Sequence, residues 1–292
     1  MNGIVVVGDV MVDVVARLSG PVAVGSDSEA SISFGGGGSA ANVAAWLAHA
    51  GAAAVLVGRV GDDARGASAA AALRASGVDA RLAVDDSLPT GTCIVLVAPG
   101  GERSMLPDAG ANSALAPADL PDSLLVPGGH LHLTGYSLVR PGPRPAALGA
   151  ISRAAAAGMS VSVDPSSAAL LGPEFLELAA GATLLLPNLA EARTLSGEGD
   201  AQTAARALAS RFPEVVVKLG AEGALWTNGG DVELVPAAPA AALDTTGAGD
   251  AFAAGLLAAR LRGAPPADAL AAGCALAAQA VVTPGARPPR GA

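Results

Sequence analysis

The chain has 292 residues, and its hydrophobic content of 51% is enough for one large buried core in a single domain. A formal net charge of -9 and a single lysine, Lys218, exclude a strongly basic surface, so neither nucleic acid nor an anionic membrane is expected as a partner. Aromatic residues make up only 2% of the chain, which leaves hydrogen bonds rather than ring stacking to provide ligand specificity.

The two cysteines and the first apolar segment indicate where the protein works. Cys93 and Cys274 lie far apart and have no metal-binding or redox spacing, which predicts reduced thiols in the core of a cytoplasmic protein. The apolar run at 4–7 is much shorter than a signal sequence or a membrane span, and it lacks basic flanks. We therefore expect neither secretion nor membrane insertion.

Short β-branched segments alternate with alanine-rich segments of helical spacing along the chain. The first expected elements are, in order, a strand at 4–7, a helix at 39–50, a strand at 54–57 and a helix at 64–76. Buried strands are expected further along at 130–134, 160–164, 183–187 and 215–218. This order predicts an α/β fold with a mostly parallel central sheet flanked by helices. Ligands bind at the carboxyl ends of the strands in such sheets.

Two segments, at about 14–35 and 90–107, interrupt this alternation because their apolar residues have no adjoining helix. We expect them to pair as a small antiparallel β lid inserted in one domain that spans 1–292. Such a sheet needs a partner, which is either the bound ligand with the main domain or the same lid of a second subunit. The second arrangement would form a symmetric homodimer through four apolar side chains, Ile32, Phe34, Ile94 and Leu96. Closure over the ligand would exclude water.

The most informative segment is Asp244-Thr245-Thr246-Gly247-Ala248-Gly249-Asp250, which precedes a stretch of helical spacing. A glycine-rich turn at the start of a helix lets backbone N–H groups converge, and the helix dipole adds to them, which favours a bound phosphoryl group. An acid in the first helical turn, Asp250, would lie beside that group. Phosphoryl transfer needs charge stabilisation, in-line positioning and a base, and this segment can supply all three. The alternative is that Asp244 only forms a turn and Asp250 only begins a helix. It is disfavoured, because a match at so many fixed positions rarely arises by chance.

This segment resembles the second signature of the PfkB carbohydrate kinase family, which includes ribokinase, fructokinase and adenosine kinase. Other segments similar to family motifs follow in family order over nearly the whole chain, at 8–13, 37–44, 58–66, 110–112 and 187–191. The resemblance implies a ribokinase-like fold and transfer of the γ-phosphoryl group of ATP, with Mg²⁺, to a hydroxyl of a monosaccharide or sugar derivative. A nucleoside acceptor is the alternative within the family. A ligand-binding homologue without catalytic activity is a third interpretation.

The resemblance also implies roles for individual residues in catalysis and in binding of the acceptor. Asp250 would be the general base, and the backbone of Gly247, Ala248 and Gly249 would form the anion hole. The acceptor would contact Asp13, Gly37, Gly38 and Asn42. Glycines there permit close approach of the backbone, while a carboxylate and an amide match the hydroxyls of a polyol.

Further roles concern the nucleotide and its metal ions. The residues implied in nucleotide binding are Asn188, Lys218, Gly220, Gly223 and Thr246. Glu191 would hold Mg²⁺ through water, which suits a hard cation that retains its hydration shell. A candidate K⁺ site would use backbone carbonyls at Asp244, Thr246 and Gly285.

Some residues permit two interpretations. Lys218 either neutralises a phosphate or extends from a strand end into solvent. Arg103 either reaches an anionic substituent on the acceptor or decorates an exposed lid strand. Met11 and Ser39 stand where ribokinase has an asparagine and a lysine, so strict specificity for ribose is not implied.

Two pairs of residues invite a metal site but favour structural roles. Asp62 and Asp63 are more typical of a turn or cap ahead of the helix at 64, because successive side chains seldom point the same way. His130 and His132 would share one face of a strand without a third ligand, so we expect packed or hydrogen-bonded histidines. The glycine-rich segment before residue 39 also permits a structural interpretation, in which it is a tight turn and Ser39 caps the helix that follows.

Overall fold

A sheet of nine strands forms the centre of the computed structural model, which describes residues 3–289. The strand order is β13-β12-β11-β10-β9-β8-β1-β4-β5. Their bounds are β1 (Ile4–Val7), β4 (Ala54–Gly61), β5 (Asp79–Asp85), β8 (His130–Thr134), β9 (Ser160–Asp164), β10 (Leu184–Leu185), β11 (Glu214–Lys218), β12 (Ala224–Thr227) and β13 (Val232–Val235). All neighbouring pairs from β11 to β5 are parallel, and only β12 and β13 pair antiparallel. The expected mostly parallel sheet is confirmed.

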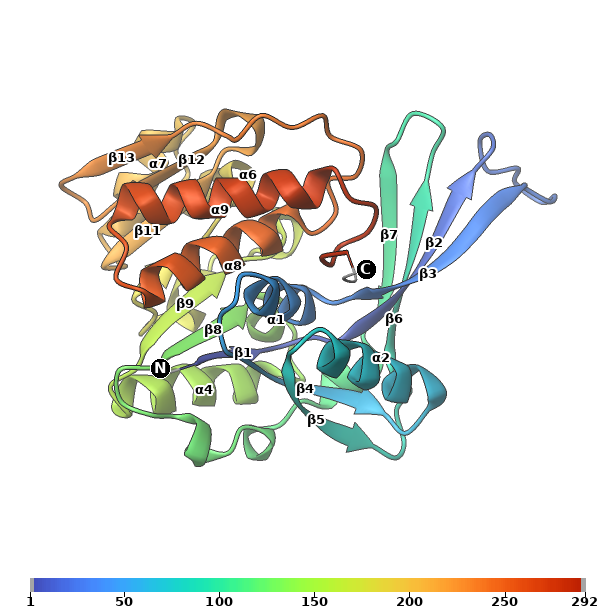
Figure 1. Cartoon of the computed structure of the whole chain (residues 1–292), viewed down its shortest axis with the longest axis horizontal. Helices are drawn as coiled ribbons and strands as arrows, with labels where there is room; N and C mark the ends of the chain where they lie inside the picture. The colour runs from blue at the N-terminus through green and yellow to red at the C-terminus, as the bar shows by residue number, and fades with distance from the viewer. Residues whose placement is uncertain (1–2, 290–292) are drawn as a thin grey trace.

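Helices cover both faces of this sheet (Figure 1). One face packs on α1 (Ser39–His49), α2 (Ala64–Ala75), α8 (Ala248–Leu261) and α9 (Pro266–Val281). The other packs on α3 (Tyr136–Val139), α4 (Arg144–Ala156), α5 (Phe175–Leu178), α6 (Leu189–Ser196) and α7 (Ala201–Ala209). Because both faces are covered, the central strands are apolar throughout instead of alternating. In β1, Val6 belongs to the first core, while Val5 and Val7 belong to the second.

The sequence-based bounds hold best where periodicity is strong. The structure places β1, α1 and α2 within one residue of the expected ranges. The expected strand at 54–57 continues to Gly61, because it also pairs with β5 along that length. The expected strand at 183–187 is reduced to Leu184–Leu185.

A second, four-stranded sheet projects from the main body at the right of Figure 1. Its strands, in the order β3-β2-β6-β7, are β2 (Met11–Leu18), β3 (Ala30–Gly37), β6 (Gly91–Val97) and β7 (Arg103–Asp108). Pairing is antiparallel within each hairpin, as expected for the lid. The two hairpins join through β2 and β6, which run parallel.

The two faces of this lid differ in chemistry because successive residues of a strand point to opposite sides. The register places Asp13 and Cys93 on one face together with Arg17 and Arg103. We call this the inner face, since its apolar residues Met11, Cys93, Val95 and Val97 are buried. The opposite, outer face carries Ile32, Phe34, Ile94 and Leu96. Ile32 and Phe34 are 61% and 76% exposed there.

Helices α8 and α9 pack with almost no space between them. A Cβ at Gly255 in α8 would lie 2.5 Å from the carbonyl oxygen of Ala272 in α9, and one at Gly273 would lie 2.8 Å from the Phe252 ring. Glycine at these two positions therefore sets the separation of the helices. Among residues 3–289, no helix is both long and apolar enough to cross a bilayer.

Gly255→Ala should destabilise the fold by about 1–3 kcal/mol, the usual range for overpacking, because the added methyl group must push α9 away. Gly149→Ala in α4 is the matched control, since a Cβ there meets no atom of the described residues within 4 Å. The control should be neutral or slightly stabilising, because alanine favours a helix over glycine by about 0.5–1 kcal/mol. Urea unfolding measures both, and equal midpoints for the two variants would contradict the packing argument.

Candidate active site

The start of α1 is shaped by a close contact with the segment after β1. Gly38 is the N-cap of α1 with a φ of 88°, and a Cβ there would lie 2.6 Å from the Asp9 carbonyl oxygen. The Asp9 carboxylate accepts hydrogen bonds from the backbone N–H groups of Ser39, at 3.0 Å, and Ala40, at 3.3 Å. Asp9, which is distant in the sequence, thus accepts hydrogen bonds from the free N–H groups in the first turn of α1. The interpretation of Ser39 as the N-cap of this helix was wrong.

The freed Ser39 side chain points instead to Asp250, in the first turn of α8. Ser39 Oγ donates to Asp250 Oδ1 at 2.7 Å, and Asn42 Nδ2 donates to Asp250 Oδ2 at 2.9 Å. Burial raises the pKa of Asp250 to about 7, against the lowering effect of these two hydrogen bonds. A carboxyl with a pKa near neutrality, held on both oxygens, suits a general base.

The glycine-rich turn before Asp250 depends on a left-handed backbone. Gly247 is the N-cap of α8 with a φ of 75°, and a Cβ there would lie 2.4 Å from the carbonyl oxygen of Ala286. Any side chain would therefore strain the turn and displace the C-terminal loop. A Cβ at Gly249 would lie 3.5 Å from Lys218 Nζ, so a cation faces the start of this helix as well. The turn, the helix N-terminus and the ammonium together favour an anion.

A cavity of about 450 Å³ opens at this turn. Three of the residues implied in nucleotide binding, Lys218, Gly220 and Gly223, line it together with Ala248 and Gly249 of α8. Its remaining walls are mostly small apolar residues of the segment 237–242 and of α9. Those walls went unnoticed in the sequence, because alanines in a loop and a helix have no distinctive pattern. Thr246 does not line the cavity, whereas the neighbouring Thr245 does.

Lys218 is held at the floor of this cavity. Its Nζ donates to Asp164 Oδ2 at 2.5 Å, and the side chain is only 13% exposed. Extension of Lys218 into solvent was therefore wrong. Asp164 is the last residue of β9, and the sequence predicted the strand but no role for this side chain.

Burial, and after it the nearby charge of Asp164, raise the pKa of Glu191 to about 7.

Asn188 and Glu191 form a reciprocal cap at the start of α6. Asn188 Oδ1 accepts from the backbone N–H of Glu191 at 2.9 Å, and Glu191 Oε2 accepts from the backbone N–H of Asn188 at 2.8 Å. The described residues contain no group of three His, Cys, Asp or Glu side chains that could hold a metal directly. Mg²⁺ needs no such group where phosphate oxygens and water supply most of its ligands, so Glu191 and Asp164, which lie near Lys218 of the cavity wall, fit a hydrated cation.

The residues of the candidate K⁺ site lie together around the Asp244 carboxylate. Asp244 Oδ1 accepts from the Thr246 N–H at 2.9 Å, and Asp244 Oδ2 accepts from the Gly285 N–H at 3.1 Å. Arg103 Nη2 lies 2.8 Å from Asp244 Oδ1, and its Nη1 donates to Thr246 Oγ1 at 2.6 Å. Arg103 therefore connects the lid to the glycine-rich turn. The interpretation of Arg103 as an exposed lid residue without a partner was wrong. A monovalent cation here would have backbone carbonyls as its ligands, since the carboxylate is already paired.

The acceptor residues converge beneath the lid. Asp13 lies within β2, where its carboxylate covers Gly37 so closely that a Cβ at Gly37 would be 2.0 Å from Asp13 Oδ1. Burial raises the pKa of Asp13 to about 6, against the opposing charge of Arg287. Arg287 Nη2 donates to the Gly37 carbonyl at 2.8 Å, and its Nε donates to Asn42 Oδ1 at 3.3 Å. Arg287 was missed because nothing in the local sequence links the C-terminal loop to α1.

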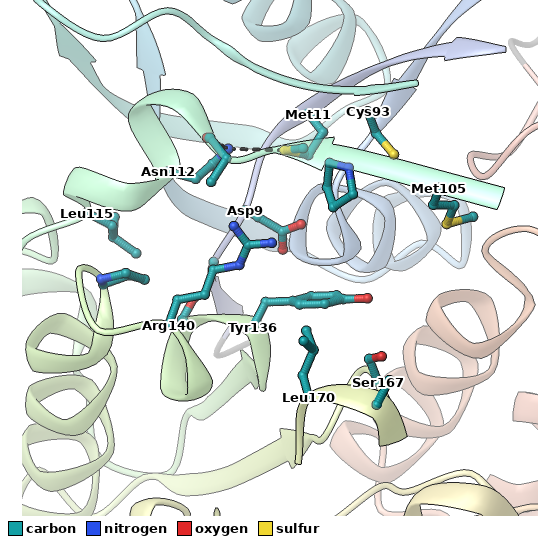
Figure 2. A pocket seen from close by; sticks show the side chains of 16 residues that line it. Asp9, Met11, Cys93, Met105, Asn112, Leu115, Tyr136, Arg140, Ser167 and Leu170 are labelled. Atoms are coloured by element: carbon teal, nitrogen blue, oxygen red, sulfur yellow. Dashed lines mark hydrogen bonds between the residues drawn. The ribbon is translucent and has the colours of Figure 1, made fainter. Parts of the chain in front are cut away.

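A second cavity, of about 360 Å³, lies next to these acceptor residues between the inner face of the lid and α3 (Figure 2). Met11 and Cys93 line it from the lid, Asp9 from the segment after β1, and Tyr136 and Arg140 from α3 and its end. The two cavities leave room for two ligands: Ala248 and Gly249, beside Asp250, line the first, and Asp9, which bonds the N–H of Ser39, lines the second.

The structural roles expected for several polar residues are confirmed. Asp63 caps α2, since its Oδ1 accepts from the Gly66 N–H at 2.8 Å. His130 and His132 both contact Ser162 through hydrogen bonds of 2.7 and 2.8 Å. Both cysteines are free and buried.

Comparison with known proteins agrees with this arrangement. The family model described as pfkB family carbohydrate kinase matches residues 1–290. An ATP-dependent ribose-1-phosphate kinase of Halopiger xanaduensis is 36% identical over 238 residues, which cover 80% of this chain and 77% of the relative.

Solved structures agree over almost the whole chain. The adenosine kinase of Sinorhizobium meliloti has a TM-score of 0.90 and 27% identity, covering 98% of this chain and 96% of its own. A fructokinase of Vibrio cholerae O395, bound to fructose, ADP and a calcium ion, has a TM-score of 0.84 and 26% identity, covering 98% and 94%. The resemblance found in the motifs is therefore confirmed, and the chain belongs to the pfkB family of carbohydrate kinases, which are ATP-dependent phosphotransferases.

Proposed function

We propose that Asp250 accepts the proton of an acceptor hydroxyl while that oxygen forms a bond to the γ-phosphorus of ATP. The bond from the γ-phosphorus to the oxygen bridging it to the β-phosphate breaks, and ADP leaves with that electron pair. The observation that carries this proposal is the Asp250 carboxylate, held by Ser39 and Asn42 at the start of α8 and next in the chain to Ala248 and Gly249, which line the 450 Å³ cavity. The backbone of Gly247, Ala248 and Gly249 stabilises charge on the transferred group.

The nucleotide occupies the 450 Å³ cavity in this proposal. Its phosphates lie toward Gly249 and Lys218, because the ammonium and the helix N-terminus are the positive groups there. Gly220 and Gly223 let the chain pass close to the rest of ATP. Mg²⁺ would neutralise the charge of the phosphates when bound, and Glu191 would hold it through water. Asn188 fixes the Glu191 carboxylate by the reciprocal cap.

The acceptor is a monosaccharide or sugar derivative bound by Asp13, Gly37, Gly38 and Asn42. Asp13 accepts hydrogen bonds from hydroxyls, and Asn42 orients Asp250 while contacting the sugar. The relatives named above act on a sugar phosphate, a sugar and a nucleoside by their names. A nucleoside is the second candidate, because the 360 Å³ cavity has the apolar side chains of Met11 and Cys93 in its wall.

The lid has two functions in this proposal, as part of a single domain over 1–292. Its inner face closes over the acceptor and keeps water from taking the phosphoryl group. Its outer face forms a homodimer, since Ile32 and Phe34 are large apolar side chains exposed on the same face of the lid as Ile94. We also propose a cytoplasmic location, where ATP is available and the two buried thiols stay reduced.

Asp250→Asn should lower kcat by about a hundredfold or more, because a positioned general base is lost. The KM for the acceptor should change little, since Asp13 and the glycines remain. Steady-state kinetics on a folded variant decide this, and a kcat near that of the wild type would refute the assignment.

The pH profile provides a separate check on the same residue. Burial raises the pKa of Asp250 to about 7, so the carboxyl becomes protonated, and loses its basicity, as the pH falls below that value. We expect kcat/KM of the wild type to fall about tenfold per pH unit on the acid side of neutrality. A profile that stays flat down to pH 5 would contradict the raised pKa.

Turnover of ATP with a panel of sugars and nucleosides tests the activity and its metal ions. We expect at least one acceptor to be phosphorylated, and we expect excess chelator to abolish the reaction because the phosphate charge is no longer neutralised. Replacing K⁺ by Na⁺ should lower the rate slightly, since Arg103 already neutralises Asp244. Binding without turnover of any acceptor would favour the inactive homologue, and equal rates in the two salts would remove the K⁺ site.

Phe34→Lys should shift the protein from dimer to monomer, because it places a charge within the proposed outer-face contact. Val24→Lys is the matched control, since Val24 is 99% exposed and lies outside the lid strands. Light scattering after size-exclusion chromatography measures the mass. A monomeric wild type at working concentration would reject the dimer and leave the lid closure intact.

A further inference from the structure

The 360 Å³ cavity beside the acceptor residues contains a guanidinium group (Figure 2). Arg140 follows the last turn of α3, and its side chain extends into the cavity toward Asp9 and Tyr136. Met11, Cys93 and Met105 form an apolar wall on the lid side. The cavity lies in the lower part of the size range of small-molecule sites, which is about 300–1,000 Å³.

Arg140 has no side-chain partner among the described residues: neither a hydrogen bond nor an ion pair joins its guanidinium to another of them. Nearby arginines differ in this respect. Arg144 donates to the carbonyls of Leu138 and Val139 at the end of α3, and Arg103 is paired with Asp244. A half-buried guanidinium beside apolar side chains is costly to leave unpaired, so its retention in the cavity points to a ligand.

Asp9 is the acid in the cavity wall, and it is already engaged. Its Oδ2 accepts from the Ser39 N–H at 3.0 Å, and its Oδ1 accepts from the Ala40 N–H and the Thr134 hydroxyl, both at 3.3 Å. It therefore serves the start of α1 rather than Arg140. Burial raises the pKa of Tyr136 to about 12, so its hydroxyl stays neutral beside the cavity.

We propose that the acceptor of this kinase carries an anionic group, a phosphate or a carboxylate, which Arg140 binds in this cavity. The proposal rests on the proposed function, because the hydroxyl to be phosphorylated must reach Asp250 at the same time. A guanidinium matches both oxyanions through two parallel N–H donors, and such charge-assisted bonds are the strong ones. The acceptor thus spans from Asp250 and Asp13, which bind its hydroxyls, to Arg140, which binds its charge.

The test compares neutral and anionic acceptors that differ in one group, with the full chain and ATP. Ribose with ribose 1-phosphate and fructose with fructose 1-phosphate examine a phosphate; glucose with gluconate examines a carboxylate; adenosine represents the nucleosides. We expect one anionic member to exceed its neutral partner in kcat/KM by about tenfold or more, the usual effect of a charged hydrogen bond. The pair that shows the preference identifies the anion.

Arg140→Gln should lower kcat/KM for that anionic acceptor by about tenfold to hundredfold and affect neutral acceptors much less. Arg140→Lys should restore part of the loss. Arg206→Gln is the matched control for charge, because Arg206 is exposed on α7, away from the cavity, and should have no effect. A preference for a neutral sugar or adenosine that Arg140→Gln leaves unaltered would overturn the anionic acceptor while keeping the kinase activity.

Binding without ATP separates this inference from the proposed function. The same sugar phosphates and gluconate are titrated against the wild type and Arg140→Gln by calorimetry. If no acceptor is phosphorylated but one anionic sugar binds the wild type and not the variant, the catalytic proposal fails and the Arg140 site stands. If neither anionic class binds the wild type more tightly than its neutral partner, the Arg140 site fails.

Discussion

The carboxylate of Asp250 and its two donors form the contact on which the rest of the site depends. Ser39 and Asn42 come from the first turn of α1, and Asp250 comes from the first turn of α8, so these hydrogen bonds join the N-termini of two helices. The amide of Asn42 has one orientation in this network, because its Oδ1 accepts from Arg287 and its Nδ2 must then face Asp250. The C-terminal loop, α1 and α8 thus meet at one buried acid.

The burial of acids in this region lowers the stability of the folded chain at neutral pH and raises the affinity of these acids for protons. Burial raises the pKa values of Asp250, Asp13 and Glu191 to about 7, 6 and 7. Each folded carboxyl holds its proton more tightly than the unfolded chain does, so the contribution of these acids to stability declines as the pH rises from about 4 to 7. Groups with shifted pKa values are common at functional sites, so the burial of these three acids agrees with the proposed function.

Local sequence predicted those parts of the fold and site that depend on local patterns. The buried run of β1 and the spacing of α1 predicted both elements, and the glycine-rich segment before Asp250 predicted the turn, because its φ of 75° at Gly247 needs glycine. The partners of Arg103, Lys218 and Arg287 were not predictable, since each lies on a distant element that only the folded sheet and lid bring near. Such side chains have ordinary neighbours in the sequence and no motif.

The contact between Arg103 and Asp244 makes the lid and the glycine-rich turn mechanically dependent on each other. Both side chains are mostly buried, with 18% and 8% exposed, and removing one partner of such a pair leaves an uncompensated charge. Arg17 of β2 also lies 3.9 Å from Asp244 Oδ2, so a movement of the whole lid away from the body would take both guanidinium groups from this carboxylate. Because Asp244 also accepts the N–H of Thr246, the same movement would loosen the backbone that leads into Gly247. In this position the lid therefore stabilises the turn, and if the turn binds the phosphoryl group as proposed, this contact links coverage of the acceptor to assembly of the anion site.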